Sequence, residues 1–253
     1  MKRILILSLS AVLIFSCKEH KKDGNEAEVE PSTELVKDVV SENEWTLLPL
    51  DKWQAFKGGE AAEYWKSEDN EIVFYPPTAE ERKKPDGGRA SFNIVTKDSY
   101  TSFVLSMEWK ISEAGNSGIM WGVSEDEKYG EPYQTGLEVQ ILDNDKHPDG
   151  KNGTSHQAGA LYDLISPAED VTKPVGEWNL AVITINHETN EGTSFLNGVE
   201  VAKFPVNGDA LNTLLKGSKF DGWDGFAAYK TGKIALQDHN DKVSFRNIRI
   251  KKL

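Results

Sequence analysis

The chain has 253 residues, with 41 acidic and 29 basic side chains and a formal net charge of −12 at neutral pH. This negative balance repels phosphate backbones, so we expect no nucleic-acid partner, whereas a neutral sugar is not excluded. The single cysteine allows no intrachain disulfide, so the hydrophobic core must stabilise the fold without one.

The first 17 residues have the features of an export signal. Lys2 and Arg3 precede an apolar run over residues 4–15, which is too short to cross a bilayer. The run ends in Phe-Ser-Cys at Cys17, which resembles a bacterial lipoprotein box whose thiol is lipidated. We therefore expect a lipid anchor that holds the protein in the bacterial cell envelope, on the periplasmic face or the cell surface. The alternative is a secretory signal with an incidental cysteine.

Two segments with different compositions follow the signal. Residues 18–43 are polar and charged, and they cannot bury enough apolar surface to offset the entropy of ordering, so they predict a flexible tether. Residues 44–253 contain no second linker and no internal repeat. This length is sufficient for one sizeable core, so the sequence predicts a single domain over residues 44–253.

Most of this domain predicts β-strands. Residues 101–111 are the clearest case, because every odd-numbered position from 103 to 111 is apolar. Asn197-Gly198 predicts a two-residue hairpin turn, and only residues 209–216 look helical. Many strands separated by short turns indicate an all-β fold of antiparallel strands, a sandwich or a barrel. The other predicted strands cover residues 71–75, 91–95, 117–123, 136–144, 178–186, 193–196, 200–204, 234–237 and 243–251.

The predicted strand over residues 136–144 carries two polar side chains on one face. Its odd positions from 137 to 141 are apolar, whereas Glu138 and Gln140 share the opposite face. They would lie roughly 6 to 7 Å apart along the strand, a spacing that suits binding a small polar ligand. The alternative is a solvated face, as in many antiparallel sheets.

Three histidines follow predicted strands or lie in the loops between them. His147 lies in a loop with Asp143, and these side chains could hold a divalent cation through imidazole and carboxylate ligands. A solvated turn is the alternative. His156 and His239 stand at strand ends, where loops often assemble sites.

Several catalytic motifs are absent from the sequence. It contains no HExxH, Walker or GxSxG motif. A retaining glycosidase commonly uses two carboxylates on alternate strand positions, but here Gln140 and Leu142 follow Glu138 on the same face. The sequence therefore argues against ordinary glycoside hydrolysis on this strand.

Eight short sequence words occur in a fixed order across the domain. Together they resemble the DUF1080 family, described as 3-keto-disaccharide hydrolases or as 3-keto-glucoside 1,2-lyase/2-hydroxy-glucal hydratases. The resemblance covers residues 45–253 and implies a concanavalin-like jelly-roll sandwich of two antiparallel sheets. One departure is Asn240-Asp241 after the seventh word, where relatives often have glycine. The words are Glu108-Trp109, Gly115-Asn-Ser-Gly-Ile119, Glu138-Val-Gln-Ile-Leu-Asp-Asn144, Gly159-Ala-Leu-Tyr162, Gly176-Glu-Trp-Asn179, Asn197-Gly198, Leu236-Gln-Asp-His239 and Phe245-Arg-Asn-Ile248.

The resemblance implies an enzyme that cleaves 3-keto-glycosides, with an oxidised carbohydrate as substrate. A ketone at C3 acidifies the C2 proton, so a base can remove it while an acid protonates the departing C1 oxygen. Addition of water to the resulting double bond gives net hydrolysis. The cofactor stays unassigned, with a divalent metal ion as one option, and the sequence does not fix the oligomeric state.

The expected site combines two reacting groups with a polar surface. Glu138 and His239 are expected to be base and acid, in an order left open. The alternatives are a carbohydrate-binding lipoprotein without catalysis and an ordinary glycosidase in which Glu108 is the second carboxylate. Expected substrate-binding residues are Glu108, Asn116, Gln140, His156, Tyr162, Gln237 and Arg246, and candidate metal ligands are Glu138, His156, Asp143 and His147.

Overall fold

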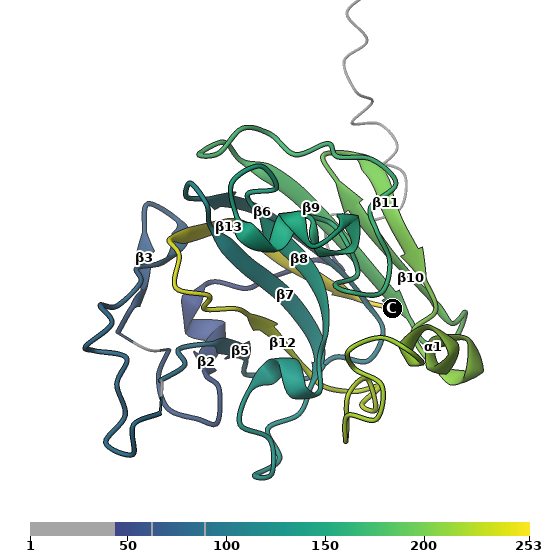
Figure 1. Cartoon of the computed structure of the whole chain (residues 1–253), viewed down its shortest axis with the longest axis horizontal. Coiled ribbons are helices and arrows are strands. Elements are labelled where there is room, and N and C mark those ends of the chain that lie inside the picture. Colours follow the sequence, from purple (N-terminus) through teal and green to yellow (C-terminus); the bar gives the residue numbers. More distant parts are fainter. Residues whose placement is uncertain (1–43, 62, 89) are drawn as a thin grey trace, which may run out of the picture. The chain divides into compact units, whose positions relative to one another are not determined.

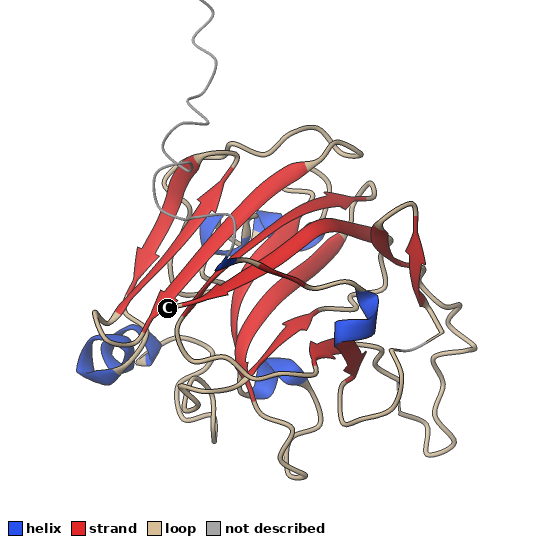
Figure 2. Cartoon of the chain, turned by 180° about the vertical axis from the view of Figure 1, so that it is seen from behind, coloured by secondary structure: helices blue, strands red, loops and turns tan. Residues whose placement is uncertain are grey.

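The computed structural model describes residues 44–61, 63–88 and 90–253, and it contains two antiparallel sheets that form a sandwich (Figures 1 and 2). This confirms the predicted all-β, concanavalin-like class. The predicted signal peptide, the anchor on Cys17 and the tether lie outside the described residues. Within the described part, no helix is long and apolar enough to cross a membrane.

One sheet has eight strands and the other has five. The larger sheet has the order β11-β10-β9-β6-β13-β4-β3, with β1 paired to β13. The smaller sheet has the order β2-β5-β12-β7-β8. The larger sheet contains β1 (Thr46–Leu47), β3 (Trp65–Glu68), β4 (Glu71–Phe74), β6 (Phe103–Ile111), β9 (Asn179–Asn186), β10 (Glu191–Leu196), β11 (Val199–Phe204) and β13 (Val243–Lys252). The smaller sheet contains β2 (Trp53–Ala55), β5 (Ile94–Thr96), β7 (Asn116–Val123), β8 (Leu137–Leu142) and β12 (Lys233–Leu236).

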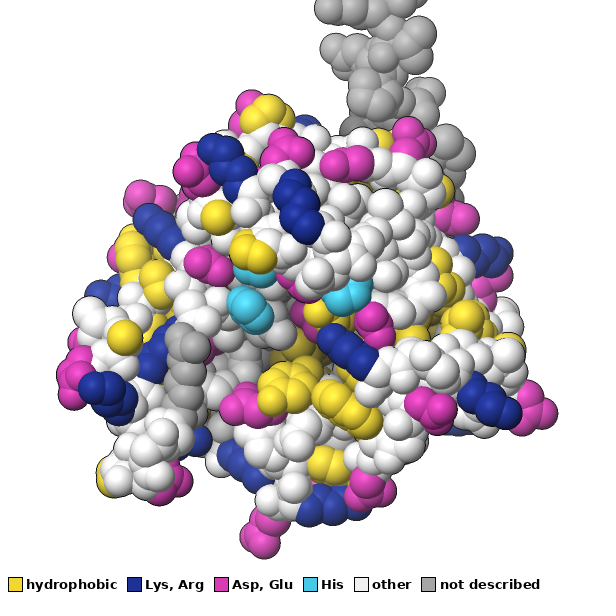
Figure 3. Space-filling model, in the orientation of Figure 1, with side chains coloured by type: hydrophobic (Ala, Val, Ile, Leu, Met, Phe, Trp, Pro, Cys, Tyr) yellow, Lys and Arg dark blue, Asp and Glu magenta, His cyan; other side chains and the backbone are white. Residues whose placement is uncertain are grey.

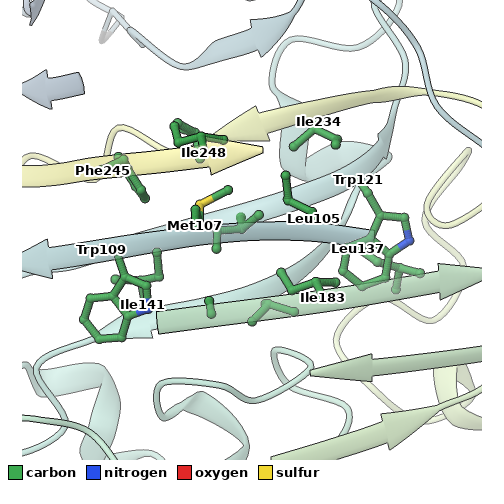
Figure 4. Packing of buried hydrophobic residues seen from close by; sticks show 14 of the residues in the cluster. Leu105, Met107, Trp109, Trp121, Leu137, Ile141, Ile183, Ile234, Phe245 and Ile248 are labelled. Carbon is green, nitrogen blue, oxygen red and sulfur yellow. The ribbon is translucent and has the colours of Figure 1, made fainter. Parts of the chain in front are cut away.

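The core lies between the sheets, where the apolar positions of both meet (Figure 4). From the larger sheet, β6 contributes Leu105, Met107 and Trp109, which are nearly inaccessible to solvent. From the smaller sheet, β8 contributes Leu137 and Ile141. Each fully buried side chain of this size contributes about 1.5–3 kcal/mol by leaving water, so the alternation of these strands fixes which face turns inward.

The hairpin and helix predictions agree with the structure. Asn197 and Gly198 both have positive φ, 51° and 87°, as the tight turn between β10 and β11 requires. The helix α1 spans Gly208–Leu215, one residue earlier than predicted. The strands β1, β2 and β3 were not predicted, because they are only two to four residues long and carry no sustained alternation.

The outer face of the five-stranded sheet is covered by loops rather than by solvent. Every residue of β7 is buried, on both faces of the strand, because one face meets the core and loops cover the other. The covering segments include three short 3-10 helices: the two that follow β8 lie over it in Figure 1, and the one that connects β7 to β8 lies beside the ends of these strands. These helices are η3 (Pro132–Gln134), η4 (Pro148–Lys151) and η5 (Thr154–His156).

Candidate active site

A cavity of about 250 Å³ lies on this outer face, between the sheet and the covering loops. Figure 3 shows a hollow in this face with histidine side chains along one edge and apolar side chains opposite. Two neighbouring strands of one sheet, β7 and β8, and four segments outside the strands thus converge on one polar space. The lining residues are Asn116, Tyr133, Gly136, Glu138, Gln140, Tyr162, Lys219, Phe220, Trp223, Phe226, Gln237 and His239.

Glu138 projects from β8 into this cavity, on the face that the alternation of the strand predicted. The neighbouring strand carries Gly118 at this point, where a Cβ atom would overlap the Glu138 carboxylate. Burial raises the pKa of Glu138 to about 8, with the charge of Lys219 acting to lower it and that of Asp149 to raise it. The carboxyl group is therefore mostly protonated at neutral pH.

Two side-chain oxygens of the cavity lining have no hydrogen-bond partner. Asn116 Oδ1 and Gln237 Oε1 are buried and unpaired among the described residues. An unpaired buried acceptor costs about 1–3 kcal/mol, which a hydroxyl-bearing ligand could offset. Gln140 lies beside them but its Oε1 already accepts a hydrogen bond from the Ile141 amide, 3.1 Å away. These acceptors suit a ligand rich in hydroxyl groups.

His239 follows β12 and reaches the cavity from its end, as the sequence predicted. Burial lowers the pKa of His239, and the nearby Asp241 carboxylate opposes this shift. The backbone amide of Asn116 donates a hydrogen bond to Asp241 Oδ2 at 3.1 Å, which holds this carboxylate in place. The ring of His147 lies 5.8 Å from that of His239.

His147, His239 and Asp241 form the one set within the described residues whose ligand atoms lie close enough to share a metal ion, within 4.8 Å. Two imidazoles and a carboxylate suit a divalent transition metal. However, His147 Nδ1 accepts a hydrogen bond from the Asp149 amide at 3.1 Å, which keeps the neutral ring protonated on Nε2. Metal binding would therefore require the His147 ring to give up this bond.

The predicted metal set is otherwise not assembled. Asp143 accepts three amide hydrogen bonds, from Ala114, Asp145 and Lys146 at 2.7–3.2 Å, so its carboxylate closes the loop instead of facing the cavity. His156 and Glu138 do not belong to the set around His239. Only His147 is common to the prediction and the structure.

A hydrogen-bonded network supports the wall of the cavity near Glu138. The Tyr162 hydroxyl donates to Asp149 Oδ2 at 2.9 Å, and burial and this carboxylate raise the pKa of Tyr162. The His156 ring lies between two carboxylates, with Nδ1 2.8 Å from Asp149 Oδ1 and Nε2 3.0 Å from Asp163 Oδ1. His156 was expected to bind substrate, but it does not line the cavity. It supports the cavity wall instead.

Lys219 is the one lysine or arginine among the described residues that line the cavity. Its Nζ lies 3.9 Å from the centroid of the Tyr162 ring, and its amide donates to Asp163 Oδ2 at 3.2 Å. The same loop carries Phe220, Phe226 and Trp223, and the Phe220 and Phe226 rings stack at 3.9 Å. Neither a hydrophobic periodicity nor a motif marks this loop as part of a site in the sequence.

Glu108 and Arg246 were expected in the site, but they lie on the opposite surface of the molecule. Both are on the outer face of the larger sheet, where Arg246 Nε and Nη2 donate to Glu108 Oε2 at 2.9 and 2.6 Å. Even positions of β6 face outward, so the hydrophobic core separates Glu108 from Glu138. Glu108 therefore cannot act as a second carboxylate beside Glu138.

A hollow lined by an acidic group, an imidazole, a cation and aromatic rings is a typical site for a small polar ligand. Residues 46–251 match the family described as a 3-keto-alpha-glucoside-1,2-lyase-like domain. The chain therefore belongs to this family of 3-keto-glycoside lyases and hydrolases.

Individual relatives agree with this assignment. A 3-keto-disaccharide hydrolase of Bacteroides thetaiotaomicron is 32% identical, over 98% of this chain and 97% of its own. A crystal structure from Parabacteroides distasonis, provisionally named a glycosyl hydrolase, is 30% identical with a TM-score of 0.73, covering 85% of this chain and 98% of that one. A second structure from that species, 23% identical with a TM-score of 0.59, supports the fold.

Proposed function

We propose that this protein cleaves 3-keto-glycosides by elimination and then hydrates the product. The observation that carries the proposal is the cavity, which brings together Glu138, His239 and Lys219 in a member of this family. Glu138 is the one carboxylate among its described lining residues, which disfavours the two-carboxylate chemistry of ordinary glycosidases.

The elimination needs a base, an acid and a group that stabilises negative charge. The base removes the C2 proton, and the electrons of that bond move toward the C3 ketone as an enolate. The enolate then expels the C1 oxygen, which takes a proton from the acid as the C1–O bond breaks. The products are a 3-keto-2-hydroxy-glucal and the free alcohol.

The raised pKa of Glu138 supports its role as the acid. With a pKa of about 8, this group holds its proton at neutral pH and can give it to the departing oxygen. His239 also lines the cavity, and its imidazole then serves as the base. A proton that it accepts is stabilised by the neighbouring Asp241 carboxylate.

Lys219 supplies the positive charge for the enolate oxygen. Its side chain is exposed at the cavity wall, with Nζ 3.9 Å from the centroid of the Tyr162 ring, and a positive charge there would stabilise negative charge that develops on this oxygen. In the hydration step, the Glu138 carboxylate takes a proton from water as its oxygen bonds to C1, and protonated His239 returns a proton to C2. Both groups then regain their starting states.

The test uses the purified protein in deuterated water, with a glucoside and its 3-keto counterpart, with and without EDTA. We expect cleavage of the keto form alone, with deuterium entering at C2, followed by NMR and mass spectrometry. Cleavage of the plain glucoside would support an ordinary glycosidase, and no cleavage of either would support a carbohydrate-binding module. Loss of activity with EDTA, restored by a divalent ion, would show that the reaction needs a metal, for which His147, His239 and Asp241 are the candidate ligands.

We also propose that Cys17 carries a lipid that anchors residues 44–253 to the cell envelope, since the signal-like segment ends at this cysteine. Metabolic labelling with a fatty-acid analogue, compared between the wild type and Cys17→Ser, tests this proposal. Labelling of both proteins, or of neither, would contradict it.

A further inference from the structure

Arg82 is the one lysine or arginine among the described residues that is fully buried, with 3% of its surface exposed. It lies in the segment that joins β4 to β5, and it does not line the cavity. Charged side chains are almost never buried unless a partner of opposite charge accompanies them. Here the partner is Asp238, the residue directly before His239.

The guanidinium of Arg82 and the carboxylate of Asp238 form a bidentate ion pair. Nη1 donates to Oδ2 at 2.7 Å and Nη2 donates to Oδ1 at 2.5 Å, and the side chains are only 4% and 1% exposed. The same carboxylate accepts hydrogen bonds from the backbone amides of Phe92 at 2.9 Å and Asn240 at 3.2 Å. These four donors occupy the lone-pair positions of an ionised carboxylate, so Asp238 has none left to act as a base or to bind substrate.

Stability alone does not explain why this pair is buried. The cost of removing two charges from water offsets much of their attraction, so a buried ion pair is weak evidence for a gain in stability. In addition, Arg82 Nε is buried without a hydrogen-bond partner in the described part of the chain, which is unfavourable. What a planar guanidinium does supply is orientation, because two parallel hydrogen bonds fix both the position and the plane of the carboxylate.

Hydrogen bonds beyond the end of β12 hold the backbone that carries His239. On one side, Ser117 Oγ of β7 donates to the Gln237 carbonyl at 2.8 Å. On the other side, the Asp238 amide donates to Asn93 Oδ1 at 2.8 Å, next to the ion pair. Because His239 follows directly, a shift of the Asp238 carboxylate would move the imidazole within the cavity.

We infer that Arg82 is a positioning residue for the elimination, and that it acts through Asp238 to hold the His239 imidazole beside the C2 proton. The inference rests on the proposed function and adds to it a residue that does not touch the substrate. A base must lie within hydrogen-bond reach of the proton it removes, so a small displacement of the imidazole slows proton transfer. The side chains that would hold the sugar line the cavity, whereas Arg82 does not, so its loss should lower kcat and leave KM nearly unchanged.

The test follows exchange of the C2 proton in deuterated water with 3-keto-1,5-anhydroglucitol, which has no leaving group at C1, so that the base is observed alone. We expect Arg82→Lys to lower kcat for exchange by about tenfold or more and to change KM by about twofold or less. Lysine keeps the positive charge but replaces the bidentate fork with a single point charge. The control is Lys83→Gln at the neighbouring exposed position, which should exchange like the wild type.

The NMR signals of the imidazoles separate positioning from a general loss of folded protein. In Arg82→Lys, at a temperature where thermal melts show the protein folded, the His239 signals should move. The signals of His187, between β9 and β10, should stay in place. Wild-type exchange in this variant, unchanged His239 signals, or a raised KM with kcat unchanged would each overturn the inference.

A double-mutant cycle tests whether Arg82 acts through Asp238. Its variants are Arg82→Gln, Asp238→Asn and the two combined, and the combination leaves no uncompensated charge in the interior. If the two residues act as one unit, the double variant should lose no more exchange than the weaker of the two single variants. A loss equal to the product of the single losses would overturn the inference. Absence of exchange in the wild type would instead contradict the proposed function, so the two failures are distinguishable.

Discussion

Glu138 combines a raised pKa with a fixed position, and these two properties have different causes. The pKa is raised because the covering loops exclude water from the carboxyl group. The position is fixed because β8 alternates and because Gly118 on β7 leaves room for the side chain. Only the second property can be inferred from the strand pattern of the sequence.

The assigned order of acid and base can be separated by isotope exchange. A 3-keto-1,5-anhydroglucitol has no leaving group at C1 and cannot undergo elimination, but it still exchanges its C2 proton if the base is intact. We expect Glu138→Gln to lose about 10²–10⁴-fold in cleavage but to retain this exchange, whereas His239→Ala loses both. Glu188→Gln, at an exposed position, is the control. If His239→Ala retains exchange and Glu138→Gln loses it, the order is reversed.

The raised pKa of Glu138 also predicts how activity and stability depend on pH. The cleavage rate should fall as pH rises through about 8, because the acid loses its proton. The folded state holds this proton more tightly than the unfolded state, whose group titrates near 4.5. The stabilisation of the folded state by this bound proton is therefore fully present below about pH 4.5 and is lost as the pH rises to about 8. Melting temperatures from pH 4 to 9 should decline less in Glu138→Gln than in the wild type, and parallel curves would contradict this.

At the scale of elements, β7 and the loops around it set the shape of the cavity. The strand needs glycine at position 118, since any Cβ would push the Glu138 carboxylate away. We expect Gly118→Ala to lower kcat/KM at least tenfold, because displacement of a reacting group by about 1 Å is costly. Gly130→Ala is the matched control, since its Cβ would meet only an ordinary contact at 3.5 Å. Wild-type activity in Gly118→Ala would contradict the assigned position.

Asp163 joins two covering segments, because one oxygen contacts His156 and the other accepts from the Lys219 amide. Its φ of 63° lies in the left-handed region, which asparagine adopts more readily than alanine. We therefore expect Asp163→Ala to lose most activity, through a displaced Lys219, and Asp163→Asn to keep more of it. Kinetics and thermal melts of both variants test this, and equal activity would show that the junction does not position Lys219.

Sequence patterns predicted the elements far better than they predicted the site. Alternation located the long strands and showed that Glu138 faces outward, because apolar residues recur at every second position of a strand that is buried on one face. It could not assign outward positions to one sheet or the other, so Glu108 and Arg246 were placed with Glu138 although the core lies between them. Lys219 and Asp241 come from loops, whose positions depend on tertiary contacts.

At the scale of the whole molecule, the sandwich separates two polar surfaces with different roles. The larger sheet carries the Glu108–Arg246 pair on its outer face, where both side chains remain partly exposed. A pair of this kind contributes about 0.2–1 kcal/mol. We expect Glu108→Gln to leave kcat/KM unchanged and to shift the free energy of unfolding by about 1 kcal/mol or less. A large loss of turnover would contradict this separation of the two surfaces.

The rim of the cavity has an optical consequence. Trp223 lines the cavity and is 41% exposed, while Trp53, Trp65, Trp109 and Trp121 are buried in the core. Intrinsic fluorescence should therefore contain a red-shifted, iodide-quenchable component from this indole and from the half-buried Trp45 and Trp178, and the part that Trp223→Phe removes belongs to the cavity. A sugar seated in the cavity would shield the ring, so ligand occupancy becomes visible in the emission spectrum without a label.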